Sequence, residues 1–107
     1  MDERLRLLHE SFTDVKIVWK DDYQYFIHPL TDGVPRLDSE LLKAVSELIF
    51  DRVEWDDIDI ILGIEAMGLP LASTISLMTN KPTLVARKRG YGLEGETVVS
   101  QQTGYSK

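Results

Sequence analysis

The sequence contains no cysteine among its 107 residues. Disulfide bonds and zinc sites with cysteine ligands are therefore excluded, and the composition agrees with a reducing compartment. Long hydrophobic runs are also missing: no stretch approaches the ~20 apolar residues of a membrane span, and the charged N-terminus does not resemble a signal peptide. These absences predict a cytoplasmic protein without a membrane partner.

Positive charge is scarce. The chain has 12 Lys and Arg against 18 Asp and Glu, which gives a formal net charge of -6. Surfaces that bind nucleic acid need cationic side chains in excess to neutralise phosphates. The sequence therefore argues against a nucleic-acid partner. A hydrophobic share of 43% is enough for the core of one small domain, or of part of a larger one.

The first part of the chain predicts a helix and a hairpin. Apolar residues among charges over residues 3–12 indicate an amphipathic helix. Alternating patterns over residues 15–20 and 23–28 flank two aspartates and predict a pair of strands. In the first of these strands the pattern places Ile17 and Trp19 on the buried side.

The rest of the chain predicts a β-α-β unit. Residues 29–35 contain two prolines and predict a loop, and Asp38 is a good N-cap for a helix that runs to about residue 52. The apolar run 58–64 is typical of a strand covered on both faces by helices. A second helix follows it, and residues 83–86 form the next strand. Strands joined in this way are parallel, so the fold class is α/β.

Two features meet at the carboxyl edge of this predicted sheet, where α/β proteins bind ligands. The turn Glu65-Ala66-Met67-Gly68 leads from a strand into a helix, and such turns present backbone N–H groups to anions. The basic run Arg87-Lys88-Arg89 leaves the parallel neighbour at the same edge. Together they favour binding of a di- or polyphosphate.

Each of these features also has a structural explanation. A glycine is common at a strand–helix turn, and three cations after a strand can form a solvated edge. His28 can cap backbone groups or contact a ligand, and the aromatic residues near it can be core or offer a face to a planar base. No set of His, Asp and Glu has the spacing of a metal site, and no residue stands in a nucleophile motif, so the catalytic residues stay unknown.

Four segments, 25–35, 63–72, 87–96 and 102–107, carry a resemblance to a known family. In this order they resemble the archaeal hypoxanthine/guanine phosphoribosyltransferase-like family and, more distantly, adenine phosphoribosyltransferases. The similarity covers nearly the whole chain from about residue 15, which makes it more specific than any single motif.

The resemblance implies a partial type I phosphoribosyltransferase fold. Residues 1–37 are expected to form the N-terminal helix and hood segment, and residues 38–107 the first part of the core, ending in the flexible loop. The family continues with a strand that ends in two acidic residues and with a Thr-Gly-Gly-Thr loop, which have no counterpart before Lys107. The C-terminal half of the fold is therefore expected to be absent, and the 107 residues alone to be inactive.

The resemblance also implies a reaction. A purine phosphoribosyltransferase transfers the phosphoribosyl group of phosphoribosyl pyrophosphate to hypoxanthine or guanine, giving IMP or GMP, with Mg²⁺ bound to the pyrophosphate. Such enzymes serve purine salvage, and a homodimer is expected. Three alternatives stay open: adenine as the base, a non-catalytic remnant that binds anions or purines, and a purely structural α/β fragment that associates through its exposed edge strand.

The site residues implied by the family fall into three groups. The pyrophosphate contacts are Glu65, Ala66, Met67, Gly68, Arg87, Lys88 and Arg89. The flexible loop contains Gly90, Tyr91, Gly92, Gly95, Gly104 and Tyr105. The purine pocket is expected near Tyr25, Phe26, Ile27 and His28.

Two departures distinguish this sequence from its adenine-specific relatives. Those relatives carry an Arg where this chain has Met67, and a Glu in the flexible loop where this chain has Gly104. At the pyrophosphate turn, side-chain contact with the ligand is therefore expected to be weaker, or the backbone alone is expected to make the contacts. Both departures favour the archaeal oxopurine-type group.

Overall fold

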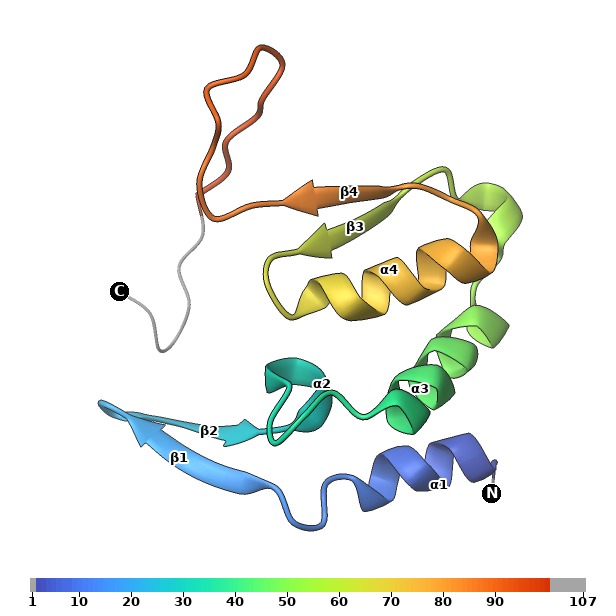
Figure 1. The fold of residues 1–107 in the computed structure, drawn as a ribbon, viewed down its shortest axis with the longest axis vertical. Helices are drawn as coiled ribbons and strands as arrows, with labels where there is room; N and C mark the ends of the chain where they lie inside the picture. The colour runs from blue at the N-terminus through green and yellow to red at the C-terminus, as the bar shows by residue number, and fades with distance from the viewer. Residues whose placement is uncertain (1, 101–107) are drawn as a thin grey trace.

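The structure, a computed structural model, describes residues 2–100 as helices layered beneath a small sheet (Figure 1). In chain order, the elements are α1 (Glu3–Glu10), β1 (Lys16–Lys20), β2 (Tyr23–Ile27), α2 (Pro29–Asp32), α3 (Ser39–Arg52), the 3-10 helix η1 (Trp55–Asp57), β3 (Ile61–Ile64), α4 (Gly68–Thr79) and β4 (Thr83–Ala86). The first helix packs on α3, α3 packs on α4, and α4 packs on β3 and β4. Within residues 2–100, none of the helices has the length and apolarity needed to span a bilayer.

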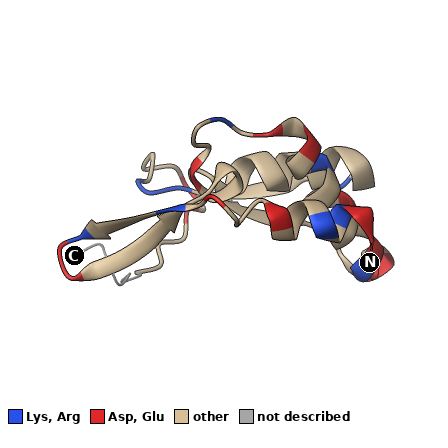
Figure 2. Ribbon diagram, turned by 90° about the horizontal axis from the view of Figure 1, so that it is seen from below, with Lys and Arg blue, Asp and Glu red and all other residues tan. Residues whose placement is uncertain are grey.

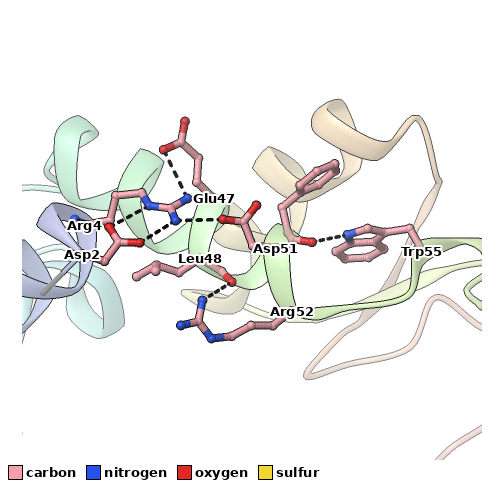
Figure 3. A network of polar contacts seen from close by, with 8 residues as sticks. Asp2, Arg4, Glu47, Leu48, Asp51, Arg52 and Trp55 are labelled. Atoms are coloured by element: carbon pink, nitrogen blue, oxygen red, sulfur yellow. Dashed lines mark hydrogen bonds and ion pairs between the residues drawn. The ribbon is translucent and has the colours of Figure 1, made fainter.

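The helices α1 and α3 pack together and are linked by ion pairs (Figure 3). Asp2 caps α1 and accepts hydrogen bonds from the guanidinium of Arg4, and these bonds lower the pKa of Asp2 to about 2. Arg4 also reaches α3, where its Nη2 lies 2.8 Å from Asp51 Oδ2. At the end of α3 the indole N–H of Trp55 donates to the carbonyl of Phe50 at 2.9 Å, which fixes the turn into η1.

The helix α3 begins where the sequence predicts. The carboxylate of Asp38 accepts hydrogen bonds from the N–H groups of Glu40 and Leu41, two of the donors that a helix start leaves unpaired. Leu41 and Leu48 are buried on the face of α3 that meets the other helices. This helix is therefore the centre of the packed layer.

The strands β1 and β2 form the predicted antiparallel hairpin, with Lys20 opposite Tyr23. The predicted buried side of β1 is wrong: Ile17 is 59% exposed and Trp19 is 67% exposed, while Val18 between them is half-buried. The reason is visible in Figure 2, where the hairpin extends away from the helices, so that little of the protein lies against either of its sides. Alternation identifies the strand but not the face that packs.

Residues 29–35 do not form only a loop, as the sequence predicted, because the short helix α2 begins there. His28 is its N-cap, and the ring Nδ1 accepts the N–H of Leu30 at 3.1 Å. Pro29 stands at the first helical position, where its fixed φ is favourable. Gly33 ends the helix in the left-handed region, with a φ of 69°.

The strands β3 and β4 are parallel neighbours joined by α4, which confirms the predicted β-α-β unit. Gly63 brings the helix close to the sheet, because a Cβ at this position would stand 2.9 Å from the Cβ of Ala72. The expectation that the strand is covered on both faces is wrong. Leu62 and Leu84, which are paired in register, are 60% and 56% exposed, since within residues 2–100 only α4 packs extensively on this sheet.

Candidate functional site at the carboxyl edge of the parallel sheet

The turn after β3 and the basic run after β4 lie side by side, as the parallel topology predicts. The N–H of Glu65 donates to the carbonyl of Ala86 at 3.0 Å, which extends the pairing of the two strands by one step. The Glu65 carboxylate then accepts the backbone N–H of Lys88 at 2.8 Å and lies 3.9 Å from Arg87 Nη1. One side chain therefore connects both segments of the predicted pyrophosphate site.

The backbone of the turn offers hydrogen-bond donors. The peptide bond between Glu65 and Ala66 is cis. Within residues 2–100, the N–H groups of Met67 and Gly68 donate to no acceptor, and Met67 makes no side-chain cap at the start of α4. Unpaired amides at a helix N-terminus attract negative charge through the helix dipole.

The packing around Gly68 favours a functional reason for this glycine. A Cβ built at Gly68 would meet only the Cβ of Ile64, at 3.8 Å, which is an ordinary contact. The protein's own packing therefore does not require a glycine here. Gly68 is exposed, so its backbone is accessible to a ligand.

The basic run is exposed and adjoins the predicted flexible loop. All three of its side chains are exposed, and the guanidinium of Arg87 lies 5.1 Å from the centre of the Tyr91 ring. A cation at this distance from an aromatic face is attracted to it. Arg87 thus lies between the carboxylate of Glu65 and the ring of Tyr91, so it connects the start of the loop to turn 65–68.

The loop that follows is folded around a carboxylate that the sequence did not single out. Glu96 accepts the N–H of Leu93 at 2.8 Å and the N–H of Tyr91 at 3.0 Å, and these hydrogen bonds lower its pKa, the one from Leu93 most. Gly92 and Gly95 take the positive φ values, 72° and 90°, that this turn requires. Two further predicted loop residues, Gly104 and Tyr105, lie outside the described residues.

His28, one of the predicted purine-pocket residues, is engaged within the protein. It is 1% exposed and stacks on Phe12, with 4.5 Å between the ring centres. Its Nδ1 accepts the N–H of Leu30, and its Nε2 lies 2.8 Å from Ser11 Oγ. The Ser11 hydroxyl donates to Leu8, so Nε2 is the nitrogen that carries the proton. Of the two roles open from the sequence, this geometry favours the backbone cap.

Burial is the main influence on the charge of His28. Removal from water lowers the pKa of the imidazole, and the nearby carboxylate of Asp32 opposes this change only in part. Asp32 is held in place because it also accepts the backbone N–H of His28 at 2.9 Å. The neutral ring is therefore the form that the folded chain stabilises.

The other predicted purine-pocket residues do not share one surface. Successive side chains of a strand point to opposite faces, and Phe26 lies on the side of His28, with 6.4 Å between the ring centres. Tyr25 and Ile27 are half-buried on the other side. Their assignment to a purine pocket stays a prediction.

An apolar groove that the sequence did not reveal lies beside the turn. It has a volume of about 360 Å³, and its lining includes Leu30 of α2, Leu42 of α3, and Met67 with Leu71 at the start of α4. These residues come from three separate segments, so no local pattern could have identified the groove. The groove lies between the apolar side of turn 65–68 and the helix α2.

Several known proteins are similar in sequence to this chain. No model of a protein family matches it. It is 54% identical over 104 residues to a "Hypoxanthine/guanine phosphoribosyltransferase" of Ferroglobus placidus, covering 96% of this chain and 54% of the relative. A protein of the same name from Aciduliprofundum boonei is 48% identical over 103 residues, covering 96% of this chain and 56% of the relative.

A third relative is the "HGPRTase-like protein" of Halobacterium salinarum, which is 47% identical over 100 residues, covering 94% of this chain and 53% of the relative. The resemblance predicted from the sequence is confirmed by these similarities. The chain spans about half the length of the curated relatives that it matches. The mixed α/β structure with its small parallel sheet agrees with a partial type I fold.

Proposed function

Because the chain is homologous to archaeal hypoxanthine/guanine phosphoribosyltransferases over about half of their length, we propose that it serves purine salvage as part of such a transferase. The reaction joins a purine ring nitrogen to the anomeric carbon of phosphoribosyl pyrophosphate and releases pyrophosphate. The products with hypoxanthine and guanine are IMP and GMP. The present chain supplies the pyrophosphate side of this site.

The observation that carries the proposal is the shared edge formed by turn 65–68 and the basic run 87–89. Glu65 connects the two segments through its hydrogen bond to Lys88. The unpaired amides of Met67 and Gly68 face a leaving group that gains negative charge, and the cations beside them stabilise the same charge. Preformed donors of this kind cost little reorganisation when pyrophosphate departs.

We propose that Mg²⁺ enters the site bound to the phosphates of the substrate. Mg²⁺ commonly keeps several water ligands and binds substrate phosphates rather than a cage of protein groups. Within residues 2–100, no three His, Asp or Glu side chains come together as a metal site. The amides of turn 65–68 and the cations of the basic run would therefore hold magnesium pyrophosphate through its oxygens.

Further parts of the proposal derive from the family resemblance. They are a homodimer, a cytoplasmic location, a boundary between hood and core near residue 37, and a closing loop from Gly90 onward. The purine pocket near residues 25–28 belongs to the same group. Among the bases, hypoxanthine and guanine are proposed first, and adenine is the alternative.

A titration of pyrophosphate tests the site directly. In the double variant Arg87→Ala and Lys88→Ala we expect binding of magnesium pyrophosphate to weaken roughly 10- to 100-fold, because charge-assisted hydrogen bonds contribute about 1.5–3 kcal/mol each and these side chains are exposed. The matched control removes two distant exposed cations, Lys16→Ala and Lys43→Ala, and changes the net charge equally. Equal affinity in the two double variants would reject the site.

A product assay tests the reaction. The chain is joined to a C-terminal half such as its relatives have and is incubated with phosphoribosyl pyrophosphate, Mg²⁺ and one base at a time, and nucleoside monophosphate is measured by chromatography. Formation of IMP or GMP supports the proposal, and formation of AMP alone supports the adenine alternative. Binding of pyrophosphate without any product supports the non-catalytic alternative.

A further inference from the structure

The side chain of Met67 reaches from the anion turn to the hood segment. A Cβ built at Gly33, the residue that ends α2, would stand 3.2 Å from Met67 Cε and 3.8 Å from its sulfur. Met67 is half-buried, and it lines the apolar groove together with Leu30 and Leu71. The thioether thus fills the space that the missing side chain of Gly33 leaves open.

The backbone and the side chain of Met67 have different roles in this arrangement. Its N–H is one of the unpaired amides of the turn, whereas its side chain makes no cap and offers no charge or strong donor to an anion. A flexible, polarizable thioether is well suited to filling an irregular apolar space. The amide can therefore serve the ligand while the side chain serves the packing.

Gly33 is the partner that this contact requires. Its φ of 69° lies in the left-handed region, and the same residue closes α2 through its N–H bond to the carbonyl of Pro29 at 3.0 Å. The position of Gly33 is thus fixed by the short helix that His28 begins. Any side chain at residue 33 would press on Met67 and, through it, on the turn.

From this geometry we infer that Met67 is a positioning residue, whose packing against Gly33 holds the amides of turn 65–68 where pyrophosphate binds. The inference rests on the proposed function, since it concerns the same anion site. On this inference the hood segment contributes to pyrophosphate binding through Met67, although none of the hood residues contacts the ligand.

The first experiment measures binding of magnesium pyrophosphate by calorimetry. Met67→Ala is expected to weaken binding about 10-fold, because small displacements of positioned groups have effects of this order or larger. Met67→Leu, which keeps apolar volume, should bind within about 2-fold of the unchanged chain. Leu71→Ala removes bulk from the same groove and is the control: its melting temperature should fall while its pyrophosphate affinity stays unchanged.

The second experiment is a double-mutant cycle between the two positions. Gly33→Ala should weaken pyrophosphate binding in the unchanged chain and weaken it less when Met67→Ala is present, because the shortened side chain no longer resists the new methyl group. We expect a coupling of about 3-fold or more, as is usual for residues in contact. The left-handed φ strains alanine equally in both backgrounds, so this strain cancels from the cycle.

The outcomes separate the inference from the proposed function. If the unchanged chain does not bind magnesium pyrophosphate, the proposed site fails and the inference fails with it. If the unchanged chain binds but Met67→Ala binds equally well, or Leu71→Ala weakens binding as much, only the inference is overturned. The inference is also overturned if the effects of Gly33→Ala and Met67→Ala on pyrophosphate affinity simply add in the double variant.

Discussion

The two sheets of this chain are of similar size but are held in place in different ways. The parallel strands β3 and β4 rest on α4, and the close approach at Gly63 places helix and sheet in direct contact. The hairpin of β1 and β2 extends away from the helices (Figure 2) and is anchored mainly at its base, where His28 contacts Phe12 and Ser11. One sheet depends on apolar packing, and the other on one buried polar residue.

Because of this difference, the same kind of substitution should affect the stability of the two sheets differently. A substitution that disturbs close packing should destabilise the parallel sheet of β3 and β4, which is called the core sheet below. A substitution that removes the hydrogen-bonded ring of His28 should destabilise the hairpin. Both sheets also have a side without close packing, where substitutions should have little effect. Four predictions test this comparison.

The largest effect is expected for His28→Ala. The change removes a buried ring, the cap of α2 and the bond to Ser11, so the free energy of unfolding should fall by about 3 kcal/mol, combining a lost cap of about 1 kcal/mol with the loss of buried side-chain volume. Urea unfolding followed by tryptophan fluorescence measures it.

The control for this prediction is the second histidine of the chain. His9 is exposed on α1, and His9→Ala should change the free energy of unfolding by no more than about 0.5 kcal/mol. If both variants unfold at the same urea concentration, His28 does not anchor the hairpin.

Gly63→Ala should have the next largest effect. The added methyl group would stand 2.9 Å from the Cβ of Ala72, an atom fixed to the backbone of α4, so helix and sheet must separate and the free energy of unfolding should fall by about 2 kcal/mol. Gly68→Ala is the matched control, because its new Cβ finds an ordinary contact at 3.8 Å. Equal loss of stability in the two variants would contradict the close packing at residue 63.

A smaller effect should appear as a dependence of stability on pH. Burial lowers the pKa of His28 below its ordinary value of 6.5, so the unfolded chain binds a proton more readily than the folded chain. The stability that His28 provides is therefore complete above about pH 6.5 and decreases as the pH falls toward the lowered pKa of the folded state.

Comparing the stability of the unchanged chain with that of the variant His28→Asn isolates the contribution of the His28 ring. His28→Asn keeps a good N-cap without a titrating ring, so subtracting its urea midpoints from those of the unchanged chain leaves the part due to the imidazole. This difference should shrink between about pH 7.5 and pH 5.5. A constant difference would show that His28 titrates alike in the folded and unfolded chains.

Local signals predicted the elements that local chemistry determines. Asp38 begins α3 as expected, and the β-α-β unit brings turn 65–68 to the basic run. The helix α2 was missed because histidine is not among the usual N-caps. Its role here depends on Ser11, which is 17 residues away in the sequence.

Features that depend on distant parts of the chain could not be predicted. The contact between Met67 and Gly33 joins segments on either side of α3, and neither residue has a neighbour in sequence that reveals it. The faces of β1 and β3 were misassigned for the same reason. An alternating or apolar pattern states which residues can be buried, whereas only tertiary packing decides which of them are.

The smallest effect is expected on the open face of the core sheet. Leu62 is 60% exposed in this 107-residue chain, so Leu62→Ala should change its free energy of unfolding by no more than about 0.5 kcal/mol. Ile75→Ala, on the buried side of α4, is the matched comparison and should cost about 2–5 kcal/mol. A loss of similar size for Leu62→Ala would mean that this face is covered in solution, and the contrast between a packed and an open side of the sheet would then no longer hold.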